Sequence, residues 1–362
     1  MAETTLKPIA YIQSDPQRRN GALVIGLGAL LLVVGLILLN FISANPTAPF
    51  LLKNVTPLVP LVGIVLVGQG VVIARMKGQR ATAWFMALPG MIVILVIVIL
   101  PTLYTWGVST IRWDAQVRDQ SFIFLENYRT LLTTSRVLDA LKNTAIVAVC
   151  AVALELILGV GLAALMTEQF RGRTFVISVI ILPLMLAPVV VGQTWRMLWD
   201  PRFGAVNDLL SRLTGQTVEL LWLGDPQLAT IAIIITDVWQ WAPFVFLVTL
   251  AGFLAVNVEL YEAAAIDGAS GWQTFLRITL PIVRPVLLVA LLFRLVDALK
   301  IFDILYLLTK GGPGYATENY SLYLYEQGFQ FFRLGYTAAG SVLFLIVVVM
   351  IATVLIRRIG EV

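Results

Sequence analysis

Six ionisable side chains interrupt segments of the sequence that are otherwise apolar: Glu155, Asp237, Arg294, Asp297, Lys300 and Asp303. A charge at the centre of a membrane-spanning helix costs about 2.5–3.5 kcal/mol on insertion scales, so such residues usually form ion pairs or bind a polar solute. The last four recur at three-residue intervals, a spacing at which opposite charges pair along a helix. Three such steps turn roughly 180° around the helix, so these four side chains cannot all face one cavity.

Two interpretations of these charges stay open from the residues alone. In the first, Arg294, Asp297 and Ala298 face a polar path through the membrane, with Asp303 nearer its outer mouth. In the second, the charges are structural, and Asp237 pairs with Arg294 or Lys300 to hold helices together. One pair can serve both purposes.

Composition excludes several other kinds of chemistry. The 362 residues contain no histidine and a single cysteine, Cys150, so histidine catalysis, an intrachain disulfide and a thiolate metal cluster are excluded. The run Lys310–Gly314 is glycine-rich, but no strand precedes it and no Gly-Lys-Ser/Thr follows, so it indicates a helix end and not a phosphate loop. We expect no enzyme activity and no cofactor in this chain, and any ATP hydrolysis must come from a separate polypeptide.

The elements that must position these residues are membrane spans. Apolar residues make up 59% of the chain and charged residues 13%, against about 25% charged in soluble domains. A span needs about 20 apolar residues. Eight segments qualify: 22–43, 56–75, 84–108, 140–166, 174–199, 227–254, 282–308 and 334–356. The sequence therefore predicts an all-α, polytopic helical bundle.

Basic residues predict the orientation of these spans. The formal charge is +4, which in a membrane protein indicates basic cytoplasmic loops rather than nucleic-acid binding. The short loop Arg75–Arg80 holds Arg75, Lys77 and Arg80 and no acid. We expect both termini in the cytoplasm, with 1–21 as a tail, 22–83 as two accessory spans and 84–358 as a six-span core.

The segment 256–281, on the predicted cytoplasmic side, carries the most specific pattern. Glu259–Ile266 indicates a short helix with an acidic start, made thin by three alanines. Gly268 ends it. Composition alone leaves two roles equally open: a helix that enters a cleft on another protein, or one that rests on lipid.

This segment resembles the EAA loop of ABC importer permeases. The pattern Glu-Ala-Ala, three residues, Gly, nine residues, Ile-x-Leu-Pro is filled by Glu262, Ala263, Ala264, Gly268, Ile278, Leu280 and Pro281. Glu126–Tyr128, Leu308–Pro313 and Gly335–Ala339 are similar to segments of the carbohydrate-uptake branch. The resemblance covers roughly residues 84–358 and extends to the eight-span layout of the larger maltose-type permeases, although 109–139 is far shorter than the outer domain of those subunits.

The resemblance implies a function and a set of partners. The chain would be a sugar permease in a bacterial or archaeal inner membrane, paired with a second, related permease. Two ATPase subunits would bind ATP and Mg²⁺, and an extracytoplasmic binding protein would deliver a disaccharide or oligosaccharide of the maltose or trehalose type. Coupling to the ATPases would fall to Glu262, Ala263, Ala264, Asp267 and Gly268, and rigid rocking of the spans would alternate access.

The resemblance also implies sugar contacts in the sixth and seventh spans. Alignment without gaps carries them to Asp237, Trp239, Gln240, Trp241, Phe244, Arg294, Asp297, Ala298 and Ile301. Aromatic faces beside polar groups suit a sugar. Because the charges differ from those of the maltose type, a charged or phosphorylated polyol is an alternative substrate, with Arg294 pairing with the anion.

Two other classes of protein remain as alternatives. A membrane-embedded enzyme would need paired carboxylates at an interface, and the acids here are scattered. A transporter driven by an ion gradient could use Glu155, Asp237 and Asp297 as a proton relay. Neither class requires the pattern at 262–281, which favours the importer.

Overall fold

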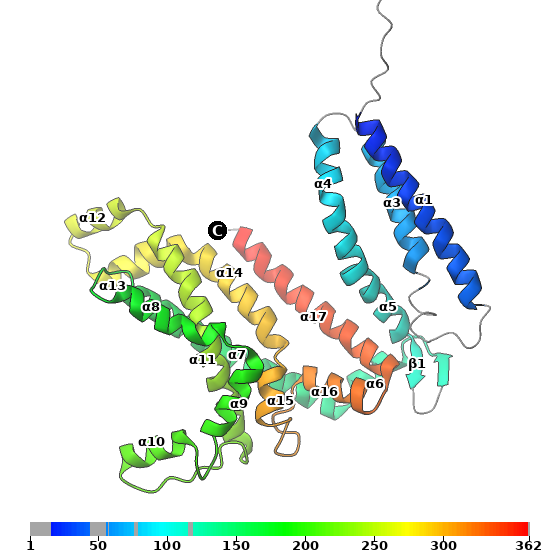
Figure 1. Ribbon diagram of the computed structural model, residues 1–362. Helices are drawn as coiled ribbons and strands as arrows, with labels where there is room; N and C mark the ends of the chain where they lie inside the picture. The colour runs from blue at the N-terminus through cyan, green and yellow to red at the C-terminus, as the bar shows by residue number, and fades with distance from the viewer. Residues whose placement is uncertain (1–15, 44–55, 57, 76–78, 115–118, 361–362) are drawn as a thin grey trace, which may run out of the picture. The chain divides into compact units, whose positions relative to one another are not determined.

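The computed structural model describes residues 16–43, 56, 58–75, 79–114 and 119–360; most of the expected tail at 1–21 lies outside them. The chain divides into two compact units, Met1–Trp106 and Gly107–Val362. Each unit is described by itself below (Figure 1).

The first unit is a small helical hairpin with a third helix. Helices α1 (Pro16–Ser43) and α3 (Leu58–Arg75) pack along each other. A Cβ on Gly28 would lie 2.7 Å from the Val67 nitrogen, so the two backbones touch where glycine stands. Helix α4 (Gln79–Ile94), the π-helical η1 (Leu95–Ile99) and α5 (Leu100–Ser109) follow without a break. These helices coincide with the first three expected spans.

The second unit is built around two long helices. Helices α7 (Ser135–Leu165) and α11 (Pro226–Leu254) pack along each other, α14 (Leu280–Leu299) packs on both, and α17 (Leu334–Gly360) packs on α14. Helices α7 and α11 approach closely at Gly159, where a Cβ would lie 2.7 Å from the Val245 Cβ. Asp225 begins α11, because its Oδ1 accepts the amides of Gln227 and Leu228 at 2.9 and 3.0 Å.

Two expected spans are interrupted. The segment 174–199 forms α8 (Arg173–Ile181), a 3₁₀ turn η2 (Leu182–Met185) and α9 (Pro188–Leu198), and the pair is bent by 98°. Pro183 and Pro188 stand at this bend, as proline kinks predict. The expected span 282–308 is not continuous: α14 ends at Leu299, and α15 (Asp303–Leu308) begins after three non-helical residues. The Asn319 Nδ2 donates to the Ile301 carbonyl within this break.

Short elements fill the connecting segments. Segment 109–139 contains a hairpin of β1 (Ile111–Asp114) and β2 (Asp119–Phe122), with Ile111 opposite Phe122, and then α6 (Glu126–Thr133). This small antiparallel pair is an addition to the expected all-helical fold. Segment 200–226 contains α10 (Ala205–Thr214), and 309–333 contains α16 (Tyr320–Tyr325) and the π-helical η4 (Glu326–Gln330). The remaining helices are α12 (Val258–Ile266), α13 (Gly271–Thr274) and η3 (Phe275–Thr279).

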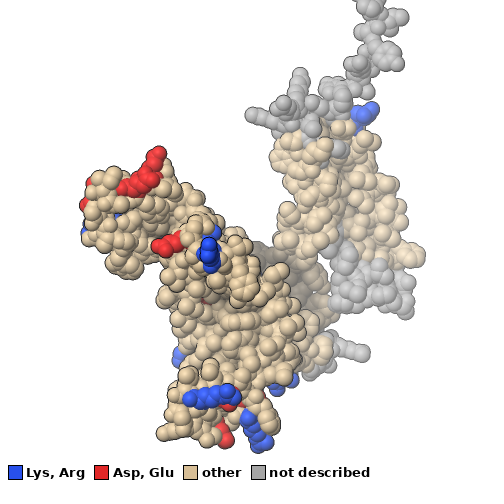
Figure 2. Space-filling model, turned by 60° about the vertical axis from the view of Figure 1, so that its left-hand side comes forward, with Lys and Arg blue, Asp and Glu red and all other residues tan. Residues whose placement is uncertain are grey.

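Five helices in the described part of the chain are long and apolar enough to cross a membrane, or six with the bent α8–α9 pair. Helix α14 is not among them, since it carries Arg284, Arg294 and Asp297. Figure 2 shows a broad, nearly uncharged band on the second unit, between charged atoms around α12 and those around α10. A band of this kind suits the hydrocarbon core of a bilayer.

Candidate functional site

Arg294 lies at the centre of a buried ion network that joins three helices. Its side chain is 2% exposed, and its Nε and Nη2 donate to the two carboxylate oxygens of Glu155 at 2.6 and 2.7 Å. Nη2 also donates to Asp237 at 3.0 Å, and Nη1 donates to Asp297 at 2.9 Å. The ring of Trp241 lies 4.7 Å from the guanidinium carbon, as in a cation–π contact. The structure contains features of both interpretations of these charges. Asp237 pairs with Arg294, as a structural role requires, and Asp237 and Asp297 also line a cavity, as a polar path requires.

The cavity has a volume of about 150 Å³ and lies beside the end of α14. Five of the nine residues that the sequence assigned to solute binding line it: Asp237, Trp241, Asp297, Ala298 and Ile301. Lys300, Asp303 and Pro188 complete much of the wall. Because α14 stops at Leu299, the residues that follow turn across the cavity instead of continuing along the helix.

The other four residues of that group lie elsewhere or behind the wall. Arg294 is held within its ion network. Gln240 is 1% exposed, and its Nε2 donates to the Leu186 carbonyl in the α8–α9 break at 3.1 Å. Its Oε1 has no hydrogen-bond partner among the described residues. Trp239 is 40% exposed and packs edge-on against Trp195 at 5.6 Å. Phe244 is half-buried and does not line the cavity.

Glu155 is the site residue that the sequence-based assignment leaves out. It is fully buried and provides both oxygens of the bidentate pair with Arg294. The signal was present, because Glu155 is the one acid in the apolar run of its span. Its partner could not be read from the sequence, since 139 positions separate the two residues.

The loop 256–281 forms a separate candidate site at one end of the second unit. The Asn257 Oδ1 accepts the Glu259 amide at 3.1 Å and begins α12. At its end, the Ala269 amide donates to the Ala264 carbonyl at 2.9 Å and the Gly268 amide to Ala265 at 3.1 Å, which is a Schellman motif. Gly268 has φ +74°, as such a motif requires.

A capping box then begins α13 and fixes the direction of the chain after the loop. The Ser270 Oγ accepts the Gln273 amide, and the Gln273 Oε1 accepts the Ser270 amide at 2.8 Å. Helix α12 is thus closed at both ends by specific hydrogen bonds.

Four of the five predicted coupling residues lie on the exposed surface of α12 and the turn that follows it. Glu262, Ala263, Asp267 and Gly268 are exposed, whereas Ala264 is 5% exposed and packs inward. Ile266, which the sequence analysis did not assign, is 87% exposed beside Asp267. Ile266 thus adds one exposed apolar side chain to this end of α12.

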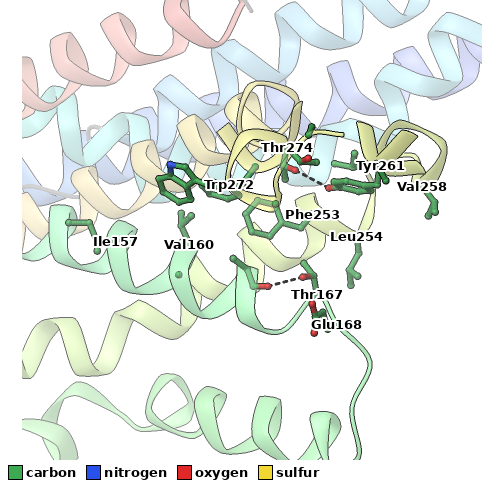
Figure 3. Close-up of a pocket in the computed structure, with 18 residues that line it drawn as sticks. Ile157, Val160, Thr167, Glu168, Phe253, Leu254, Val258, Tyr261, Trp272 and Thr274 are labelled. Carbon is green, nitrogen blue, oxygen red and sulfur yellow. Dashed lines mark hydrogen bonds between the residues drawn. The ribbon is translucent and has the colours of Figure 1, made fainter. Parts of the chain in front are cut away.

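A groove of about 960 Å³ lies behind α12 (Figure 3). Phe253 and Leu254 of α11, Trp272 of α13 and Ile157 of α7 make its wall mainly apolar. The Thr279 hydroxyl donates to the Tyr261 hydroxyl at 3.2 Å, which ties α12 to the start of α14.

A second ion network lies near the start of α7. Arg136 donates to Glu318 at 2.6–2.7 Å and also to Glu326, and its guanidinium carbon lies 3.7 Å from the centre of the Tyr315 ring. Burial raises the pKa of the Glu318 carboxyl above its ordinary value, while the Arg136 pair opposes this shift. The network fastens α7 to the segment before α16, through Glu318, and to η4 after α16, through Glu326.

The second unit thus combines apolar helices, a buried charge network and an exposed end loop, which together fit a protein embedded in a membrane. The model of the family described as "Binding-protein-dependent transport system inner membrane component" matches residues 155–361. The chain belongs to this family and is a multi-pass inner-membrane protein; members of the family are transport subunits and not enzymes themselves.

Named relatives agree with this assignment. The trehalose/maltose transport system permease protein MalF of Thermococcus litoralis is 37% identical over 291 residues, covering 80% of this chain and 97% of the relative. The trehalose transport system permease protein SugA of Mycobacterium tuberculosis is 32% identical over 283 residues, covering 78% and 90%. A crystal structure of a bacterial ABC transporter for the acidic polysaccharide alginate matches with TM-score 0.68 and 26% identity, covering 78% of this chain and 96% of that chain.

Proposed function

We propose that this chain is one of two permease subunits of an ATP-driven, binding-protein-dependent importer for a disaccharide or short oligosaccharide. Two separate ATPase subunits bind ATP and Mg²⁺, and an extracytoplasmic binding protein delivers the sugar. Names of the relatives support the substrate class, because two of them transport trehalose or trehalose and maltose. A further solved relative is in complex with an alginate pentasaccharide-bound periplasmic protein.

The single observation that carries the proposal is the construction of α12. It is an exposed short helix with fixed ends, and Glu262 and Ala263 face outward from it. A surface of this kind transmits force from a partner to the spans behind it, through contacts such as Tyr261 with Thr279. Glu262, Ala263, Ala264, Asp267 and Gly268 therefore form the coupling site of the proposal.

In this proposal the cytoplasmic side is the side of α12. Eight segments cross the membrane: six form the core, and the helices within 22–83 are accessory. The broken seventh segment passes the cavity, which is where interrupted helices of transporters place their solutes. Both chain termini then lie in the cytoplasm.

The size of the cavity supports a paired permease. Pockets for small molecules usually enclose about 300–1,000 Å³, and this cavity encloses about 150 Å³. A second subunit that contributes the facing wall would complete the space for a disaccharide. Trp241 offers a stacking face, and Asp297, with 51% of its side chain exposed, offers a hydrogen-bond acceptor for sugar hydroxyls.

Reconstitution of the complete transporter tests the proposal. The chain is co-expressed with its partner permease, the ATPase subunits and the binding protein, purified through a tag on this chain and placed in vesicles. We expect the ATPases to co-purify, and labelled trehalose or maltose to accumulate only with ATP and binding protein. Uptake at full rate without ATP would contradict the proposal and favour an ion-driven transporter.

A further inference from the structure

Arg294 is a buried positive charge behind the cavity wall, with 2% of its side chain exposed, and most of its hydrogen-bond donors are used within the protein. A guanidinium has five N–H donors, and four of the donor positions of Arg294 are given to Glu155, Asp237 and Asp297. Trp241 covers one face of the group. One N–H on Nη1 is left over, so an anionic solute entering the cavity meets at most one donor on this arginine, beside the Asp297 carboxylate that Nη1 already binds.

The cavity wall itself carries more acid than base. Asp237, Asp297 and Asp303 line it together with one base, Lys300. Behind the wall, the negative charge of Glu155 balances the positive charge of Arg294. The set thus has two bases against four acids, and protonation of one buried carboxyl would still leave it negative. Low-dielectric surroundings strengthen the resulting field.

We infer that this cavity is a charge filter that admits neutral or cationic polyhydroxyl solutes and rejects anionic ones such as uronic acids and sugar phosphates. Arg294 acts as a positioning residue that holds Asp237 and Asp297 at the wall. Asp297 and Asp303 are the residues that set the sign of the field. The inference rests on the proposed function, since a charge filter matters only on a solute path. It replaces the expectation that Arg294 pairs with an anionic substrate.

The filter is testable without knowing the sugar, because the chain has one native cysteine. In a Cys150→Ala background, Ile301→Cys places a thiol in the cavity wall, and Leu221→Cys places a reference thiol on the surface, where Leu221 is 59% exposed. The complete transporter in lipid nanodiscs is treated with cationic MTSET or anionic MTSES. The ratio of the MTSET and MTSES reaction rates reports the local electrostatic potential. A change in the reactivity of the thiol itself alters both rates alike and leaves their ratio unchanged.

We expect the cation-to-anion rate ratio at Ile301→Cys to exceed that at Leu221→Cys by more than about fivefold, because a potential of one kT separates opposite unit charges roughly sevenfold. Adding Asp297→Asn and Asp303→Asn should bring the ratio close to the reference. Adding Asp208→Asn, on exposed α10, should leave it unchanged.

An equal ratio at the two positions, or a ratio that the two Asp→Asn changes leave intact, would overturn the filter. Failure of both reagents to react at Ile301→Cys and at a second wall position, Phe302→Cys, would also overturn it, because a closed cavity selects nothing. None of these outcomes depends on ATP or on a sugar. A transporter that fails the uptake test of the proposed function therefore gives a distinguishable result here.

Discussion

Glu155 and Arg294 form a bidentate ion pair, with distances of 2.6 and 2.7 Å, between α7 and α14. Removal of one partner from a buried pair costs about 3–5 kcal/mol, because the remaining charge is left uncompensated. Arg294→Met would leave Glu155 and Asp237 buried without a counter-charge. We expect a large loss of folded transporter, measured by size-exclusion yield and thermal denaturation in detergent.

The matched control for this change is Arg212→Met. It breaks the pair between Arg212 and Asp208, whose side chains are 77% and 61% exposed. Such a surface pair is worth about 0.5 kcal/mol or less, so stability should hardly change. Combining Arg294→Met with Glu155→Gln and Asp237→Asn should restore much of the lost stability. No recovery in the triple variant would argue against a mainly electrostatic role of Arg294.

Two glycines of α7 should respond in opposite ways to the same substitution. Gly159→Ala places a methyl group against Val245 and the Phe246 backbone of α11 and should destabilise the core by about 1–3 kcal/mol. Gly161→Ala meets nothing within 4 Å and should be neutral or stabilise by up to about 1 kcal/mol. The measurement is the midpoint temperature of thermal denaturation of the two purified variants. Equal midpoint temperatures would contradict close packing of α7 on α11.

Gly268→Val should uncouple the transporter without preventing its insertion. A β-branched residue at φ +74° is strongly disfavoured, so the end of α12 must change shape. We expect ATP-dependent uptake to fall more than about fivefold at normal membrane abundance. Gly271→Val, at the start of α13 where a Cβ meets nothing within 4 Å, is the control and should retain uptake. Similar losses in both variants would remove the special role of Gly268.

Trp241→Ala and Trp239→Ala separate the cavity from the outer surface of the same helix. Loss of an aromatic stacking face costs about 0.5–1.5 kcal/mol, or about two- to tenfold in affinity. We expect this weakening of apparent sugar affinity in Trp241→Ala only, because Trp239 packs on Trp195 instead. Affinity is measured from the sugar dependence of uptake. The reverse order of effects would move the solute path to the other face of α11.

Arg136→Ala should make stability depend on pH. Without Arg136, the buried Glu318 loses the cation that opposes its raised pKa, so that pKa rises further. A carboxyl with a raised folded-state pKa contributes stability at low pH that is lost as pH rises. The cost of Arg136→Ala, about 1–3 kcal/mol for an unpaired buried group, should therefore be smaller at pH 5 than at pH 7.5. In a Glu318→Gln background this pH difference should disappear; its persistence would assign it to another group.

Hydropathy predicted most of the helices, because a span of 20 apolar residues has few other structures available. One local end signal was also predicted correctly, because Gly268 closes α12. The break after Leu299 could not be predicted, since Ile301 and Phe302 continue the apolar pattern and the stabilising contact comes from Asn319, 18 positions away. The local sequence there is compatible with a continuous helix, but a hydrogen bond from a distant residue accompanies the break.

The candidate site was predictable as a set of residues but not as a geometry. The three-residue spacing predicted that Arg294 and Asp297 pair along α14, and the two side chains form a hydrogen bond of 2.9 Å. Contacts between helices, such as Arg294 with Asp237, depend on how helices rotate against each other. Trp239 and Trp241 illustrate the limit, because two residues along a helix differ by about 200° in direction. Only a rotation fixed by packing shows which of them faces the cavity.

The hairpin beside α6 has a practical consequence for anyone who cuts or tags this protein. Asp114 of β1 bridges to Arg333, and Gly335 at the start of α17 has no room for a side chain against Ile111. Trimming the hairpin would therefore release the first turn of the last helix, which begins at Leu334. Shortened versions for crystallography should keep it whole.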